Sequence, residues 1–317
     1  MIKKLLIYNS GGGLGDSIQL FPLILSLKNL FEKPEIYYLG AHENHYLGRL
    51  KEYNVKVKSL NLGLKYFGFR WWHLFATRKS FFKLKLNKFD LIIDCQSKLR
   101  NTIILKQIPS KAFYSPTFNN IFCSRLEKPA KKFCSDLKTA NYDIKNIPKK
   151  YFDEASKLLP NKDYIGFSLT QGNVYRKKEW ALNKVIKLSN ELVKNNRIPV
   201  FFIEKKYQEL KNKIKNSIPS AVFPEHETDL GSPALVTCLG KRLDFAISID
   251  NGIMHMLSLA KIPMVVLFGP TSSKKFAPNY EDIILIDSKK LKNTSDINSI
   301  NVEDVLRELK LHSSFSY

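Results

Sequence analysis

Residues 248–271, SIDNGIMHMLSLAKIPMVVLFGPT, constrain the fold more than any other stretch of the chain. An apolar run ends at Asp250, Asn251-Gly252 is a turn signal, and apolar residues then recur at helical spacing before a second apolar run. Two strands joined by a helix are typical of a parallel sheet. The helix starts beside Gly252, where unpaired N–H groups and the positive dipole end favour an anion such as a diphosphate, with His255 one turn in.

Strand and helix runs alternate along the rest of the chain, which indicates parallel sheets covered by helices. We expect strands at 5–9, 35–40, 56–62, 89–95, 163–169, 198–204, 244–250 and 263–269, and helices at 18–31, 98–108 and 183–196. A joint is expected between Asn141 and Asp163. The 317 residues suggest two domains, 1–150 and 151–317, each a Rossmann-like, doubly wound α/β unit, facing across a cleft. The last helix could pack back on the first domain.

Composition excludes several classes of protein. The hydrophobic content of 44% argues against disorder, no stretch reaches the roughly 18 apolar residues of a membrane span, and the N-terminal LLIY is too short for a signal peptide. The four cysteines, Cys95, Cys123, Cys134 and Cys238, have no CxxC spacing, so we expect reduced thiols and no metal site. A cytoplasmic protein is expected.

The net charge of +22 is unevenly distributed. Residues 1–150 carry +17 and residues 151–317 carry +5. A basic half attracts nucleic acid, anionic membrane surfaces or anionic substrates. The 42 lysines against 9 arginines also indicate a compositional bias, which does not explain the asymmetry. Residues 64–86 mix eight aromatics with six Lys or Arg, which favours either an interfacial membrane anchor or a helix whose aromatic side is core.

The glycine-rich segment GGGLGDS, residues 11–17, directly follows the first strand. Glycines allow close approach of a ligand to the backbone, but the spacing is not the dinucleotide fingerprint. Asp16 has two open interpretations. It caps the following helix, or it is a general base at the carboxyl edge of the sheet.

A third polar segment, SLTQGNVYRKKEWA at residues 168–181, follows the first strand of the second half. The hydroxyls of Ser168 and Thr170 suit an oxygen-rich ligand, and one lysine could neutralise a leaving diphosphate. A solvated basic loop is the alternative for any one lysine. Trp180 suggests that this loop folds against its domain.

Together these motifs resemble glycosyltransferase family 9, the heptosyltransferases of lipopolysaccharide synthesis. The resemblance rests on GLGDSIQLFP, FDLIIDCQSKLRN, KKEWA and SIDNGIMHM followed by LFGPT, in order from Leu5 to about Pro278. It implies a GT-B fold with an acceptor-binding first domain and a second domain that binds an ADP-linked sugar.

Site residues follow from the resemblance by position. Asp16 matches the catalytic base. Donor binding is assigned to Ser168, Thr170, Lys178, Asp250, Asn251, Gly252 and His255, and the acceptor-side loops to Gly13, Gly15, Gln96 and Arg100. The ribose contact stays open between Glu204 and Glu209, and the adenine pocket is placed around Asp229 to Ser232. Position 251 is Asn where several family members carry Ser or Thr.

The expected reaction is an inverting, metal-independent transfer of a heptose-type sugar from an ADP-sugar to a lipopolysaccharide core or a similar anionic, lipid-linked acceptor. No cofactor is expected besides the nucleotide-sugar donor, and the protein could lie peripherally at the inner membrane. Alternatives are another GT-B transferase with a different nucleotide sugar, a family member that has lost catalysis, or a basic nucleic-acid-binding protein, for which no motif is apparent. GGLGD also resembles glycogen and starch synthases, but their chains are longer and DNGIMH does not fit their donor site.

Overall fold

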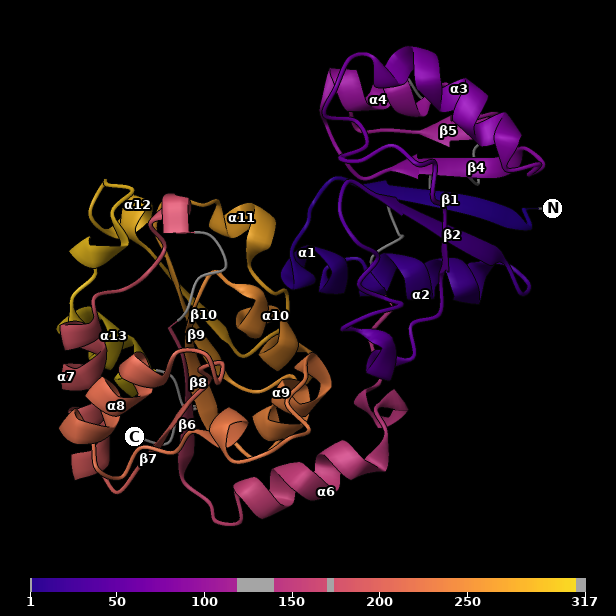
Figure 1. Cartoon of the computed structure of the whole chain (residues 1–317). Helices are drawn as coiled ribbons and strands as arrows, with labels where there is room; N and C mark the ends of the chain where they lie inside the picture. Colours follow the sequence, from indigo (N-terminus) through magenta and orange to yellow (C-terminus); the bar gives the residue numbers. More distant parts are fainter. Residues whose placement is uncertain (1, 119–139, 170–173, 312–317) are drawn as a thin grey trace. The chain divides into compact units, whose positions relative to one another are not determined.

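The structure is a computed structural model that describes residues 2–118, 140–169 and 174–311. The chain divides into two compact units, Met1–Tyr142 and Asp143–Tyr317 (Figure 1). Each unit is built on one five-stranded, wholly parallel sheet, so the two-domain α/β fold that the sequence predicts is confirmed.

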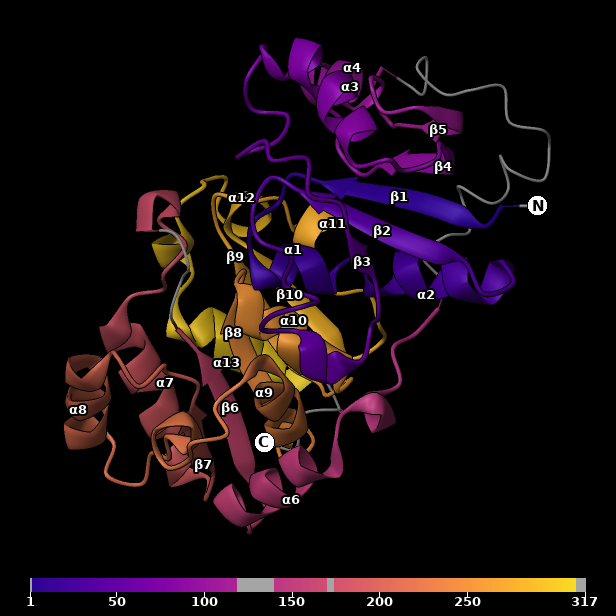
Figure 2. The ribbon, with the colours of Figure 1, turned by 45° about the vertical axis from the view of Figure 1, so that its right-hand side comes forward.

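Unit 1 has the strand order β3-β2-β1-β4-β5, which can be followed in Figure 2. Its strands are β1 (Lys4–Asn9), β2 (Glu35–Gly40), β3 (Lys58–Ser59), β4 (Phe89–Asp94) and β5 (Ser110–Tyr114). Its helices are α1 (Leu14–Ile18), α2 (Phe21–Leu30), η1 (Lys51–Tyr53), α3 (His73–Lys83) and α4 (Leu99–Leu105). Helices α1 and α2 cover one face of the sheet, and α3 and α4 cover the other (Figures 1 and 2). The strand order reverses direction between β1 and β4, where doubly wound sheets bind their ligands.

Unit 2 has the order β10-β9-β8-β6-β7. Its strands are β6 (Tyr164–Ser168), β7 (Ile198–Phe201), β8 (Phe245–Ile249), β9 (Met264–Phe268) and β10 (Ile283–Asp287). Its helices are η2 (Ile144–Asn146), α6 (Lys149–Leu158), η3 (Val174–Arg176), α7 (Leu182–Lys194), α8 (Gln208–Ser217), η4 (Pro224–His226), α9 (Pro233–Gly240), α10 (Gly252–Leu259), α11 (Ser273–Phe276), α12 (Ser288–Leu291), η5 (Ile297–Ser299) and α13 (Val302–Leu311). Its switch point lies between β6 and β8.

The central strands β1, β4, β6, β8 and β9 are buried on both faces, which explains their continuous apolar runs. In unit 1, Leu6 and Tyr8 of β1 pack in one cluster with Phe81 of α3 and Ile104 of α4. The Tyr8 hydroxyl donates to the Phe67 carbonyl (3.0 Å), and burial raises the pKa of Tyr8. The polar ends of these strands therefore lie on a rigid apolar base.

In unit 2, one large cluster joins the central strands to α7, α8 and α13. Helix α13 contacts α7 and buries Val305 and Leu309 in the unit 2 core, and the expectation that the last helix packs back on the first domain stays a prediction. The division at Tyr142 lies eight residues before the expected boundary, and residue 150 falls inside α6.

Local structure departs from the expected elements at four places. The strand expected at 56–62 pairs only over Lys58–Ser59, and the helix expected at 18–31 is two helices, α1 and α2. Strands β5 and β10 were not expected. Within the part of the chain that the structure describes, no helix has the length and apolar character needed to cross a bilayer.

Candidate functional site

The switch point of unit 2 is closed by a side-chain bridge between its two central loops. Ser168 ends β6 and Asn251 follows β8, and the Asn251 amide Nδ2 donates to Ser168 Oγ (2.6 Å). The same amide group accepts the Met254 backbone N–H at Oδ1 (3.0 Å), so Asn251 is the N-cap of α10. The helix thus starts at Gly252, where the sequence placed it, and its first turn is held beside β6.

A lysine–carboxylate pair lies next to this helix start. Lys178 Nζ is 2.5 Å from Asp250 Oδ2 and donates to the Asp250 carbonyl (3.0 Å). The two side chains are 12% and 7% exposed, so the pair is largely withdrawn from water. A cation is thereby fixed at the carboxyl end of β8, beside the helix start at Gly252. This arrangement can neutralise a phosphate with donors from two chain segments.

The remaining donor-side predictions are placed unequally. His255 is buried in the first half of α10, and its carbonyl accepts from Ser258 Oγ. Trp180 is buried and donates through Nε1 to the Ile300 carbonyl (3.0 Å), which anchors the basic loop on unit 2. Thr170 lies outside the described residues.

Three of the four residues expected near the nucleoside pair with a lysine or cap a helix. Glu204 pairs with Lys206 (2.8 Å) and Asp229 with Lys205 (3.1 Å). Glu209 is exposed in the first turn of α8, and Ser232 is the N-cap of α9. None of these four side chains hydrogen-bonds or ion-pairs with Lys178 or Asp250 in the part of the chain that the structure describes, so the ribose and adenine contacts stay predictions.

The switch point of unit 1 is built around Asn9, the last residue of β1. Its Oδ1 accepts from the Gly11 N–H (3.0 Å) and from Gln96 Nε2 (2.6 Å), and its Nδ2 donates to the Asp16 carbonyl (3.4 Å). One buried amide therefore ties the glycine-rich loop to the loop after β4. Unit 1 and unit 2 share this device, an amide bridge between the two strands at which the sheet order reverses.

Asp16 is the third residue of α1, and its carboxylate folds back over the glycine-rich loop. Oδ2 accepts the Gly13 backbone N–H (3.0 Å), which is the reciprocal half of a capping box. Asp16 is therefore not the N-cap of a following helix, as the capping interpretation expected; Gly13 is the N-cap of α1, and Asp16 contributes from inside that helix. The general-base role remains a prediction, because capping engages Oδ2 and leaves the side chain at the same edge of the sheet. Gly15 is buried inside α1.

Asp94, which ends β4, is a buried carboxylate that holds the second loop. Its Oδ1 accepts the Gln96 N–H (2.9 Å), and its Oδ2 accepts from Thr102 Oγ1 (2.6 Å) and Ser115 Oγ (2.8 Å). Burial raises the pKa of Asp94, and these hydrogen bonds oppose the shift. Asp94 thereby fixes the position of Gln96, which in turn meets Asn9.

Arg100 lies beside the aromatic side chain of Phe69, next to the loops described above. Its Nε donates to the Gly68 carbonyl (2.8 Å), and its guanidinium lies 5.9 Å from the centre of the Phe69 ring. Lys98 Nζ lies at the same distance from that ring. The unit 1 loops therefore carry two cations near one exposed aromatic side chain.

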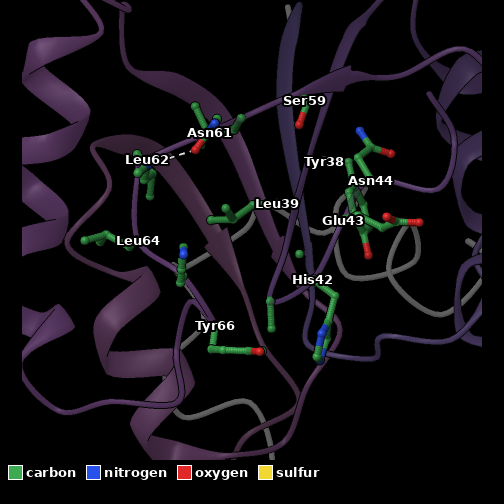
Figure 3. A pocket seen from close by; sticks show the side chains of 15 residues that line it. Tyr38, Leu39, His42, Glu43, Asn44, Ser59, Asn61, Leu62, Leu64 and Tyr66 are labelled. Atoms are coloured by element: carbon green, nitrogen blue, oxygen red, sulfur yellow. Dashed lines mark hydrogen bonds between the residues drawn. The ribbon is translucent and has the colours of Figure 1, made fainter. Parts of the chain in front are cut away.

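A cavity of about 680 Å³ opens near Phe69, at the carboxyl ends of β2 and β3 (Figure 3). His42 and Tyr66 lie at one end of it, with ring centres 5.5 Å apart. Polar groups of Asn44, Ser59 and Asn61 line other parts of the cavity (Figure 3). A volume of this size suits a sugar or a comparable polar ligand.

Sequence reasoning missed Asn9, Asp94 and His42. The first two end buried strands, a position that is itself a signal in parallel sheets, but their partners lie up to 87 residues away. His42 carried no motif, and its importance comes from the cavity. No group of three or more His, Cys, Asp or Glu able to hold a metal occurs among the residues that the structure describes, and Cys123 and Cys134 lie outside them.

Comparison with known proteins identifies the family of this chain and proteins that share its fold. Residues 121–304 match the model of glycosyltransferase family 9 (heptosyltransferase). No curated protein sequence matches the chain.

Three solved structures share the fold over nearly the whole chain. A family 9 glycosyl transferase from Veillonella parvula is 15% identical, with a TM-score of 0.68 and coverage of 98% of this chain and 96% of its own. The E. coli ADP-heptose LPS heptosyltransferase II is 15% identical, with a TM-score of 0.62 and 98% of both chains covered. E. coli heptosyltransferase WaaC, solved with ADP, is 12% identical, with a TM-score of 0.63 and 97% of both chains covered.

Proposed function

This chain belongs to glycosyltransferase family 9, the heptosyltransferase family, and we propose that it moves a heptose-type sugar from an ADP-linked donor to an anionic glycan acceptor. The observation that carries the proposal is the switch point of unit 2. There the Lys178–Asp250 pair, the Ser168–Asn251 bridge and the start of α10 lie together.

Donor binding is assigned to this switch point because its groups suit a diphosphate. The first N–H groups of α10 have no helical partner and carry the positive end of the dipole, and the Lys178 ammonium, held by Asp250, adds a charged donor beside them. The Ser168–Asn251 bridge fixes that helix start before a ligand arrives, which reduces the cost of ordering it. The structure of E. coli heptosyltransferase WaaC, which was solved with ADP, supports an adenine nucleotide as the donor group.

Acceptor binding is assigned to unit 1. Asp16 and Gln96 are bonded to Asn9 at the carboxyl end of β1, Arg100 is bonded to the Gly68 carbonyl, and the neighbouring cavity carries His42. The surrounding charge is strongly positive, since residues 1–150 hold +17. An acceptor with phosphate or carboxylate groups fits this field; a lipopolysaccharide core is the proposed example.

The proposed reaction is a single displacement with inversion at the anomeric carbon. Asp16 takes the proton from an acceptor hydroxyl as that oxygen bonds to the anomeric carbon. The bond from this carbon to the diphosphate oxygen breaks, and ADP leaves with the electron pair. Lys178, His255 and the α10 start stabilise the leaving charge, which is the role that a divalent metal has in other transferases; metal independence belongs to the same proposal.

Two measurements test the function. In a thermal-shift panel, ADP and ADP-heptose should raise the melting temperature more than UDP- and GDP-sugars at equal concentration, because stabilisation follows RT ln(1 + [L]/Kd). Transfer to a delipidated, phosphorylated core oligosaccharide is then followed by mass spectrometry, with and without EDTA. A preference for a UDP- or GDP-sugar would instead support another GT-B transferase. Nucleotide-independent binding of oligonucleotides would support the nucleic-acid alternative.

Asp16→Asn separates the two roles of this residue. The amide oxygen can still accept the Gly13 N–H, so the cap is kept, while the base is lost. We expect turnover to fall about 10² to 10⁴-fold with the melting temperature and ADP stabilisation unchanged. Near-normal turnover of a folded Asp16→Asn enzyme would exclude Asp16 as the base.

A further inference from the structure

One segment of unit 1 has no acidic side chain at all. Between Glu52 and Asp90 the sequence contains no Asp or Glu and nine Lys or Arg. Chains with mixed surface charge normally intersperse both signs. Any partner of this segment therefore meets an uncompensated positive field.

Helix α3 in this segment has two different faces. His73, Thr77 and Phe81 recur every fourth residue and are buried against unit 1. Phe75 and Phe82, one turn apart from Arg78 and Lys79, lie on the opposite stripe and are exposed. In Figure 1 the helix lies on the outside of its unit, above the sheet.

The outward stripe is apolar to a degree that solvent-facing helices rarely show. Phe75 is 82% exposed, and Trp71, Trp72 and Phe82 are each 56% exposed. We name these four, together with Arg70, Arg78, Lys79, Lys83 and Lys85, the α3 surface. Large aromatics left in water at one place mark a contact site.

The mixture of side chains selects the kind of contact. Tryptophan and phenylalanine beside long basic side chains match the boundary of a bilayer, where rings enter the headgroup region and ammonium or guanidinium groups stay at its surface. The Arg78 guanidinium already lies 5.9 Å from the Phe82 ring centre, so charge and apolar surface occupy the same spot. A protein partner would need a carboxylate-rich apolar groove; a leaflet of anionic lipid supplies both features at once.

We propose that the α3 surface docks unit 1 on an anionic lipid bilayer, with Trp71, Trp72, Phe75 and Phe82 entering the headgroup region. This inference does not depend on which sugar is transferred. Its consequence for the site is local. Tyr66 and Phe69, just before the α3 surface, contact His42 of the cavity, so a lipid-linked glycan held at the bilayer lies near the acceptor side of unit 1.

Tryptophan fluorescence reads this docking directly, because the chain has three tryptophans and Trp180 is buried at 5% exposure. Vesicles of phosphatidylcholine with about a third phosphatidylglycerol are added to the full chain at low salt. The emission of Trp71 and Trp72 should shift to the blue and become protected from acrylamide, and raising the salt should reverse both effects. Pure phosphatidylcholine vesicles should give a much smaller shift.

Two double variants test the assignment without touching the reporters. Arg78→Gln with Lys79→Gln should weaken vesicle binding about fivefold per charge removed, and Phe75→Ala with Phe82→Ala should reduce binding and the blue shift together. Lys213→Gln with Lys290→Gln removes the same charge from unit 2 and should leave binding unchanged. Tyr207→Ala is the matched aromatic control in that unit. Transfer to a water-soluble acceptor should be normal in all four proteins.

Several outcomes would overturn the proposal. Absence of binding at low salt, or binding with unprotected tryptophans, excludes this surface. Equal loss in the α3 and control variants shows a general charge effect. Tight binding of oligonucleotides in place of vesicles identifies a nucleic-acid surface, and a dimer that the phenylalanine variant dissociates identifies a contact between two copies. If the parent protein binds vesicles as expected but does not transfer sugar to the water-soluble acceptor, the proposed function is contradicted and the docking proposal stands.

Discussion

Lys178 and Asp250 show how a single pair can serve both stability and ligand binding. Each is withdrawn from water, and each satisfies the charge of the other. Removing one partner of such a pair leaves an uncompensated buried charge, whereas replacing both by apolar groups often restores stability. The two contributions can therefore be separated by substitution.

Lys178→Met should lower the free energy of unfolding by about 3 kcal/mol, because the Asp250 carboxylate is left unpaired. Lys178→Met with Asp250→Leu should recover most of that loss but should not recover stabilisation by ADP, which needs the cation. Urea titrations and thermal shifts with ADP measure both quantities. The matched control is Lys177→Met, an exposed neighbour, which should change neither one. ADP stabilisation that survives in the double variant would remove Lys178 from the donor site.

Individual residues were predictable where their signal is local. Asn251-Gly252 marks a helix start by its own chemistry, and the structure places the N-cap there. Asn9 and Asp94 were not predictable, because their meaning comes from Gln96, Thr102 and Ser115, which only the folded sheet brings to them. A polar residue at the end of a buried strand marks an edge, but it does not name the partner across that edge.

At the scale of elements, α3 joins two interpretations that the sequence left as alternatives. One side of the aromatic segment is core and the other faces outward. Adjacent phenylalanines, Phe81 and Phe82, lie on different sides and provide a matched pair.

Phe81→Ala should cost about 3 to 5 kcal/mol of unfolding free energy, because a ring that is 1% exposed is removed from the unit 1 core. Phe82→Ala should change stability by less than about 0.5 kcal/mol, because that ring already lies in water. Equilibrium urea unfolding of both variants measures the difference. Equal costs would mean that both rings are buried and that α3 has no outward aromatic stripe.

Element boundaries were less predictable than element types. The apolar pattern of 18–31 is continuous, but Pro22 lacks the N–H that would continue a helix from α1, so α1 ends and α2 begins with the proline in its first turn. Strand β5, SKAFY, is short and mixed in polarity, and its strand character comes from pairing with β4.

At the scale of the whole molecule, the two units use different strand orders to reach the same result. One reverses between β1 and β4, the other between β6 and β8. Alternating strand and helix runs predicted two parallel sheets, and the family resemblance predicted the GT-B class. Neither the alternation nor the resemblance, as used here, predicted the order of the strands within each sheet, because that order depends on which face each connecting helix covers.

The free energy of unfolding should fall as pH rises through the mildly acidic range toward neutrality. Burial, with a smaller effect of Glu204, raises the pKa of Glu225 to about 7 from its usual value near 4.5. The folded chain therefore keeps a proton that the unfolded chain releases, so stability decreases from about pH 4.5 to about pH 7 and then levels off. The decrease amounts to at most about 3 kcal/mol.

Glu225→Gln should remove this decrease, because an amide has no proton to lose. Urea titrations at about pH 5 and about pH 8 should show a smaller difference for Glu225→Gln than for the parent protein. Glu227→Gln, at an exposed position two residues away, should keep the parent's pH dependence. Identical pH profiles for Glu225→Gln and the parent would mean that the fold does not raise the pKa of Glu225.

Asn251 is also a site at which the protein is prone to slow chemical ageing, because glycine follows it. An asparagine followed by glycine is the pair most prone to deamidation, since the next backbone nitrogen attacks the side-chain carbonyl when the chain is free to bend. In the fold, Met254 N–H and Ser168 hold that amide in place. Deamidation at position 251 should therefore occur only when the start of α10 opens. It would convert the Asn251 amide into a second carboxylate beside Asp250. That carboxylate would repel the anion that we propose this site binds.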